Sequence, residues 1–173
     1  QLIEKNNLPA TMTLMGLGAI PSNHPNAMGM LGMHAARSTN MALEECDLLI
    51  AAGVRFDDRA TGKVSEFCPN ANVIHIDIDP SEVHKLKRAN IALVGDLHSC
   101  IEELLPFVTA QKREHWHRRI SELQSRYPMT IPESLTPQKP YGLIRKVADL
   151  VGDDASVTTD VGKHQMWTAQ VYP

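Results

Sequence analysis

The sequence has few cysteines, and their spacing excludes the common cysteine-based architectures. Cys46, Cys68 and Cys100 are the only cysteines, and no two of them form a CxxC pair. An odd number of widely spaced cysteines argues against a disulfide framework and against a structural zinc site. The sequence therefore favours a reducing compartment, and we expect the protein in the cytoplasm or in a stroma.

Long apolar runs and concentrations of one charge are also missing. No apolar run approaches the roughly 20 residues that a membrane-spanning helix needs, and no signal peptide is recognisable. Lysine and arginine are scattered and the formal net charge is −3, so we expect no nucleic-acid or membrane partner. The histidines show no zinc-site spacing, and nucleophile-elbow and Walker motifs are absent. With 43% hydrophobic and 21% charged residues, the composition is that of a globular protein.

Short apolar runs that alternate with helical patterns are present instead. Dense apolar runs bounded by turn residues are typical of strands buried on both faces, and they occur at residues 10–15, 48–53, 73–77 and 91–95. Residues 37–46 and 80–88 have helical patterns, with Ser38 as a possible N-cap and Pro80 at a helix start. The alternation predicts right-handed crossovers and a doubly wound α/β fold, with a mainly parallel sheet and helices on both faces.

Residues 97–126 have a helical pattern that we expect to close a first domain, residues 1–126. Residues 127–140 contain Pro128, Pro132, Pro137 and Pro140. Proline lacks the amide hydrogen and clashes with the preceding helical turn, so this segment is predicted to be a linker.

The last part of the sequence has the pattern of the start of another domain, residues 141–173. Residues 141–151 predict an amphipathic helix, and residues 156–160 predict a strand. The sequence begins without methionine in what is predicted to be a helical tail, and it ends soon after that strand. We therefore expect it to be a piece of a longer protein.

The segments after the first strand are rich in glycine, methionine and leucine. In open α/β sheets, ligands bind beyond the carboxyl ends of the strands. Glycine allows close approach of the backbone to a ligand, and methionine offers adaptable contact to a flat ring, although methionine-rich loops are equally often core filler. The spacing does not match the GxGxxG pattern of nicotinamide-binding domains. The candidate residues here are Thr13, Leu14, Met15, Leu31, Gly32, Met33 and His34.

Arginines and acids follow the later strands. An arginine beyond a buried strand could hold a diphosphate, and an acid there could accept a hydrogen bond from a ribose hydroxyl. A solvated ion-pair cluster and ordinary helix caps are the competing interpretations. Because all four predicted strand ends carry glycine, an acid or arginine, the pattern as a whole favours a bound dinucleotide. The candidates are Gly53, Arg55, Asp57, Arg59, Asp77, Ile78, Gly95 and Asp96.

Several sequence strings resemble the acetolactate synthase family of thiamine-diphosphate enzymes, and the resemblance extends over nearly the whole chain. They are LMGLG (14–18), LGMH (31–34), RFDDR (55–59), HIDID (75–79), TDVG (159–162) and HQMW (164–167). The resemblance implies an enzyme that decarboxylates pyruvate on thiamine diphosphate and condenses the two-carbon unit with pyruvate or 2-oxobutyrate, in branched-chain amino acid biosynthesis. It also implies Mg²⁺, a homo-oligomer and a regulatory small subunit.

The resemblance also implies where the cofactors bind. Residues 1–126 would be the central, FAD-binding domain, and the strand-end candidates above would line an extended FAD that has no net redox role. Residues 141–173 would begin the thiamine-diphosphate domain, with Val161, Gly162 and His164 at the diphosphate. Lys163 stands where the family usually has glutamine, and Ala35 stands where glycine is usual.

The family's activating glutamate and its magnesium-binding motif are not found in these residues, so residues 1–173 alone are expected to be inactive, with no catalytic or metal-ligating residue. Two alternatives remain at this stage. One is a related carboligase or oxidase, similar to glyoxylate carboligase or pyruvate oxidase, against which the block at residues 55–59 argues. The other is a stand-alone nucleotide-binding or regulatory module.

Overall fold

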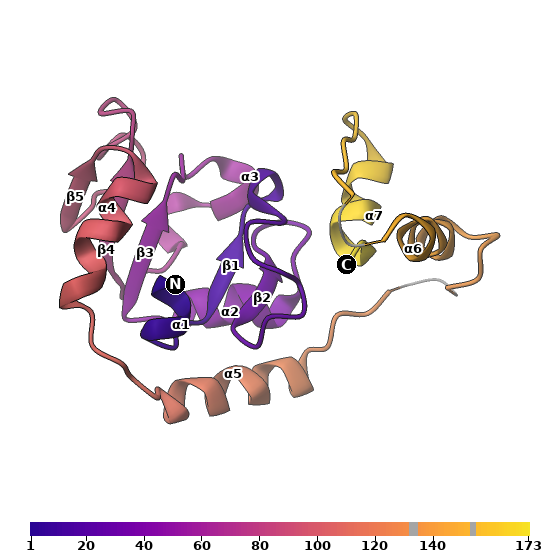
Figure 1. Ribbon diagram of the computed structural model, residues 1–173, viewed down its shortest axis with the longest axis horizontal. Coiled ribbons are helices and arrows are strands. Elements are labelled where there is room, and N and C mark those ends of the chain that lie inside the picture. Colours follow the sequence, from indigo (N-terminus) through magenta and orange to yellow (C-terminus); the bar gives the residue numbers. More distant parts are fainter. Residues whose placement is uncertain (132–134, 153–154) are drawn as a thin grey trace.

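The computed structural model describes residues 1–131, 135–152 and 155–173, and it contains two parallel sheets (Figure 1). In one sheet, β1 (Ala10–Met12) pairs with β2 (Ala27–Met30). In the other, the order is β3 (Leu48–Ala52), β4 (Asn72–Asp77) and β5 (Ile91–Val94). All the pairings are parallel, and helices lie on both sides, so the predicted doubly wound α/β fold is confirmed.

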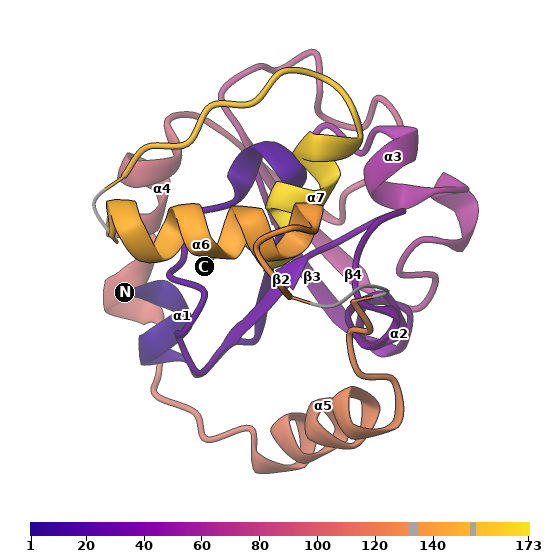
Figure 2. The same ribbon diagram turned by 90° about the vertical axis from the view of Figure 1, so that its right-hand side faces the viewer.

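The longer helices pack on the sheets or on one another. α2 (Arg37–Glu45) contacts β2 and α5 (Glu114–Arg126), and α4 (Leu97–Leu104) contacts β4. α6 (Pro140–Val151) packs against α7 (Lys163–Val171), and in Figure 2 α6 crosses in front of the sheets. The short elements are α1 (Leu2–Lys5), α3 (Asp58–Thr61) and the 3₁₀ helices η1 (Leu14–Gly16), η2 (Val64–Glu66) and η3 (Leu105–Phe107).

Two clusters of buried apolar side chains stabilise these layers. The first lies at β3 and β4 around Phe56, and the second joins α2 to α5 around Leu123; both side chains are 1% exposed. At the edge of the second cluster, Arg119 on α5 donates hydrogen bonds to both carboxylate oxygens of Glu45 on α2, at 2.8 and 2.7 Å. A bidentate pair of this kind adds orientation to the apolar contact.

The strand predictions at residues 48–53, 73–77 and 91–95 are confirmed to within one residue at each end. The first predicted strand is shorter than expected, because the chain turns into η1 directly after Thr13. β2 was not predicted. It has only four residues, and Gly29 within it has φ 72°, which is unlike a regular strand.

Residues 156–160 form no strand, which corrects the prediction made for them. No strand in the described part of the chain pairs with this segment, and Val157 remains 47% exposed. A single extended segment gains no ladder hydrogen bonds, so its apolar pattern alone does not produce a strand.

The predicted helix at residues 80–88 is also wrong, because the chain forms successive turns there. The amide groups of Glu82 and Val83 donate to carbonyls three residues back, and His84 has φ 62°. That left-handed residue ends any helical path, and its ring accepts a hydrogen bond from the Ala89 amide at 3.2 Å.

The helix predicted at residues 37–46 is present, but Ala36 and not Ser38 is its N-cap. The helical region predicted at residues 97–126 is interrupted between η3 and α5, where Arg113 has φ 48°. The helix predicted at residues 141–151 is confirmed as α6. The domain boundaries stay a prediction, and part of the predicted linker lies outside the described residues. Within the described ranges, no helix is both long and apolar enough to cross a bilayer.

The cluster between α2 and α5 generates a stability prediction. Leu123→Ala removes a buried side chain and leaves a cavity, so the free energy of unfolding should fall by about 2–5 kcal/mol. Urea denaturation followed by far-ultraviolet circular dichroism measures the change. Leu150→Ala on α6 is the matched control, because Leu150 is 73% exposed, and it should change the free energy by less than about 0.5 kcal/mol. Equal losses in both variants would contradict the assignment of this cluster to the core.

Candidate functional site

All the residues predicted to bind FAD lie at, or shortly after, the carboxyl end of a strand. Thr13, Leu14 and Met15 follow β1, and Leu31, Gly32, Met33 and His34 follow β2. Gly53, Arg55, Asp57 and Arg59 follow β3, Asp77 and Ile78 are at the end of β4, and Gly95 and Asp96 follow β5. Parallel pairing therefore puts the candidates of each sheet on one edge.

Backbone hydrogen bonds beyond the strands join these segments to one another. The amide of Leu31 donates to the Met12 carbonyl at 2.9 Å, and the amide of Gly53 donates to the Ile76 carbonyl at 2.8 Å. Between the two sheets, the amide of Met33 donates to the carbonyl of Arg59 at 3.0 Å. The structure thus brings the segments after β2 and β3 together. We call the candidate FAD residues named above, which follow the five strands, the strand-end edge.

Large apolar side chains are exposed along the strand-end edge. Met15, Met33 and Ile78 are 87%, 71% and 72% exposed, respectively. The competing interpretation of the methionines as core filler fails for Met15 and Met33, because neither is buried. Exposed apolar side chains beside open backbone form the kind of surface that a flat aromatic ring covers.

The two arginines of the segment after β3 are exposed. Phe56 has φ 57° and a side chain that is 1% exposed, so its ring turns into the core between Arg55 and Asp57. Among the described residues, Arg55 and Arg59 form no salt bridge, which argues against the solvated ion-pair cluster. Both guanidinium groups have hydrogen-bond donors to offer to an anion.

The carboxylates of the edge also organise local backbone. Asp57 caps α3 by accepting hydrogen bonds from the amides of Arg59 and Ala60, and Asp96 caps α4 by accepting from Ser99. Asp77 accepts from the amide of Asp79 at 2.9 Å. The cap interpretation is therefore correct for Asp96, and Asp57 is a cap that the sequence did not predict.

Hydrogen bonds to the ionised form lower the pKa of two carboxyl groups that follow strands, those of Asp96 and Asp79. The backbone amide of Ser99 lowers the pKa of Asp96, and that of Ser81 lowers the pKa of Asp79. A lowered pKa in the folded state stabilises the fold above the ordinary carboxyl pKa, and this contribution is lost as the pH falls through the lowered value.

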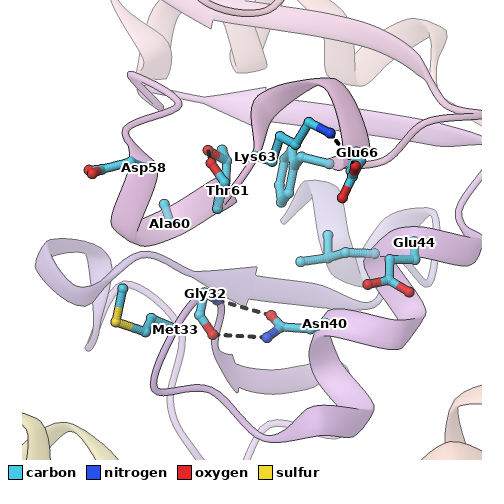
Figure 3. Close-up of a pocket in the computed structure, with 12 residues that line it drawn as sticks. Gly32, Met33, Asn40, Glu44, Asp58, Ala60, Thr61, Lys63 and Glu66 are labelled. Atoms are coloured by element: carbon cyan, nitrogen blue, oxygen red, sulfur yellow. Dashed lines mark hydrogen bonds and ion pairs between the residues drawn. The ribbon is translucent and has the colours of Figure 1, made fainter.

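A pocket of about 300 Å³ lies beside this edge, between α2 and the segment that contains α3 and η2 (Figure 3). Gly32 and Met33 are the only predicted FAD residues that line it. In Figure 3 the Asn40 amide faces the Gly32 backbone and makes two hydrogen bonds with it. Sequence reasoning missed Asn40, although an amide in the first turn of a helix after a glycine-containing segment was a usable signal.

His75 is a second residue that sequence reasoning missed. Its side chain is fully buried, and neither ring nitrogen has a hydrogen-bond partner among the residues that the structure describes. Nε2 lies 3.7 Å from an oxygen of Asp77, and the ring packs edge-on to Phe56 with centroids 5.1 Å apart. A polar residue at an inward position of a buried strand was the signal in the sequence.

The residues predicted to contact thiamine diphosphate lie at the amino end of α7. Gly162 is the N-cap, Val161 is 86% exposed, and His164 is in the first turn. Gln170 on the same helix donates to the carbonyl of His34 at 3.2 Å, which connects α7 to the segment after β2. Across residues 1–131, 135–152 and 155–173, no group of three or more histidine, cysteine or acidic side chains could hold a metal ion.

The two departures from the family pattern do not strain the backbone. Ala35 is not among the residues with positive φ, so alanine fits where glycine is usual. Lys163 is exposed in the first turn of α7.

A family model and individual relatives both match this chain, and they agree with each other. The family model described as thiamine pyrophosphate enzyme, central domain, matches residues 1–104. The acetolactate synthase isozyme 1 large subunit of Escherichia coli (strain K12) is 53% identical over 173 residues, which are 100% of this chain and 31% of that protein. The acetolactate synthase large subunit of Parasynechococcus marenigrum (strain WH8102) is 47% identical over 173 residues, or 98% and 28% of the two chains. The chain thus spans about a third of the length of these relatives.

The glycine of the segment after β2 generates a prediction. Gly32 has φ 96°, and an added Cβ would lie 2.4 Å from the Arg59 carbonyl oxygen. Gly29 has φ 72° with no atom within 4 Å of the added Cβ, so Gly29→Ala is a matched control. Gly29→Ala should cost about 1–2 kcal/mol of stability from φ alone. Gly32→Ala should cost a further 1–3 kcal/mol, roughly, because the backbone must move. Equal costs in urea denaturation would show that the contact with Arg59 is not tight.

Proposed function

Because the chain belongs to the thiamine pyrophosphate enzyme family, whose central-domain model matches residues 1–104, we propose that it supplies the FAD site of an acetolactate synthase large subunit. The whole enzyme would decarboxylate pyruvate and condense the two-carbon unit with pyruvate or 2-oxobutyrate. It would work in the cytoplasm as a homo-oligomer with a regulatory small subunit. The reaction class is a transfer of a two-carbon group.

The observation that carries this proposal is the combination of chemical groups along the strand-end edge. FAD has two flat ring systems, ribose hydroxyls and a diphosphate, and each has a suitable partner there. Met15, Met33 and Ile78 offer exposed apolar surface. Arg55 and Arg59 offer guanidinium donors that no described carboxylate occupies.

The backbone of the edge supports the same assignment. Gly53 has φ 62° and open space around the position of an added Cβ, so a ligand can approach the main chain closely. Asp77 is at the end of β4, the position from which an acid commonly accepts a hydrogen bond from a ribose hydroxyl. The residues present therefore fit FAD, which when bound would supply structural contacts and no net redox chemistry.

The amino end of α7 supports the thiamine-diphosphate part of the proposal. Backbone amides at a helix start attract phosphate groups, and Gly162 is the N-cap of this nine-residue helix. Val161 and His164 would lie at the diphosphate, and Lys163 adds a positive charge beside it. Thiamine diphosphate supplies the ylid chemistry when bound. The resemblance also implies Mg²⁺ in the whole enzyme, bound by a motif that is not found in residues 1–173.

The matched relatives favour acetolactate synthase over the alternatives. Those compared above are acetolactate synthase large subunits, and their matches extend through α6 and α7 as well as through the central domain. A stand-alone nucleotide-binding module would not need that second region. The block at residues 55–59 supports the same choice over a related carboligase or oxidase.

The proposal predicts that the chain of residues 1–173 binds FAD saturably through Arg55. Arg55→Ala should weaken binding about tenfold or more, because a charge-assisted contact to the diphosphate is lost. Titration followed by flavin fluorescence and by calorimetry measures the affinity. Arg118→Ala on α5 is the control, since this exposed arginine lies outside the edge, and it should leave the affinity unchanged. Equal affinities in all three proteins would rule out Arg55 as a diphosphate ligand.

The proposal also predicts that a polypeptide of residues 1–173 forms no acetolactate from pyruvate, even with thiamine diphosphate, Mg²⁺ and FAD added. The family's activating glutamate and its magnesium-binding motif are not found in residues 1–173. A colorimetric assay for acetolactate tests this. Steady acetolactate formation by the purified polypeptide would contradict the prediction that residues 1–173 are inactive.

A further inference from the structure

Gly32 is held from two sides. On one side, its amide donates to Oδ1 of Asn40 at 3.0 Å, and Nδ2 of Asn40 donates to its carbonyl at 2.9 Å. On the other side, its Cα faces the backbone of Arg59 and Ala60, where an added Cβ would lie 2.4 Å from one atom and 3.0 Å from another. Gly32 is buried, so both of its polar groups need partners within the protein.

The Asn40 amide takes the place of a neighbouring strand. A primary amide carries a donor and an acceptor side by side, which is the pattern that the edge of a strand presents. Asn40 lies in the first turn of α2, and α2 is fixed by its contacts with α5 and β2. The Asn40 side chain therefore connects α2 to the segment that follows β2 (Figure 3).

The same segment is bonded to α3 directly after Gly32. The amide of Met33 donates to the carbonyl of Arg59 at 3.0 Å, and the amide of Arg59 donates to Asp57 at 3.1 Å. One continuous set of hydrogen bonds thus runs from Asn40 through Gly32 and Met33 to Arg59. It holds Met33 and Arg59, which follow strands of different sheets, next to each other.

We infer that Asn40 is a positioning residue for the FAD site: its amide fixes the Gly32 backbone and thereby the placement of Met33 against Arg59. The inference rests on the proposed function, because these two residues are part of the proposed FAD site. Asn40 itself touches no cofactor in this assignment. Its effect is to order the site before FAD binds. An ordered site loses less conformational entropy on binding, so FAD binds more tightly.

The chemistry of the contact dictates the variants. Asn40→Asp keeps the size and the acceptor, but it removes the donor and puts a carboxylate against the Gly32 carbonyl. Asn40→Leu removes both groups. Asn70→Asp is the matched control, because Asn70 is exposed and takes no part in the contact with Gly32.

The experiment measures two properties of the full chain. Hydrogen exchange of the Gly32 and Met33 amides, without FAD, reports on the contact itself. FAD affinity, from flavin fluorescence, reports on its role. Asn40→Asp should raise the exchange rate and weaken FAD binding, each about tenfold. Asn40→Leu should do so more strongly, and Asn70→Asp should do neither. Urea denaturation shows which variants are folded, and if Asn40→Leu is not, Asn40→Asp decides.

The outcomes separate this inference from the function on which it rests. Unchanged exchange in a folded Asn40 variant would overturn the contact, and faster exchange with unchanged FAD affinity would overturn the positioning role. If the unaltered chain binds no FAD, the proposed function fails together with the positioning role. The exchange rates still decide in that case whether Asn40 holds Gly32.

Discussion

The parallel pairing of the strands is the constraint on which the site depends. Parallel strands end on the same side of their sheet, so the segments after the strands of each sheet, which are distant in sequence, meet at one edge. Main-chain hydrogen bonds past the strand ends then fix neighbouring segments to each other, as between Gly95 and the carbonyl of Asp77 at 3.0 Å. Because backbone atoms do this work, the side chains of Met15, Arg55 and Ile78 remain exposed.

The sequence was most informative where one local pattern decides the structure. Three dense apolar runs became β3, β4 and β5, since burial on both faces requires such runs. Prediction from the sequence failed where contacts between distant segments decide the structure. β2 contains a glycine with positive φ, His84 interrupts a helical pattern in the same way, and residues 156–160 have no strand beside them.

The site shows the same division. The types of residue at the strand ends were predicted, since a strand end is visible in the sequence. Asn40 was not, because its role requires a helix and a distant segment to meet at hydrogen-bonding distance. His75 was missed although its position in a buried strand was a signal; only its packing against Phe56 depends on the turn after β3.

The carboxylates that serve as caps have a consequence for the interpretation of sequence alignments and alanine scans. Asp57 and Asp96 accept backbone hydrogen bonds whether or not a nucleotide is bound, so selection for a stable fold alone would retain them. Their persistence in relatives would therefore say little about ligand binding, and their removal would mix unfolding with lost affinity. Arg55 and Arg59 have no such structural bond through their side chains in the described ranges. Whether relatives keep or lose these two arginines therefore reports on ligand binding more directly than the conservation of the capping carboxylates does.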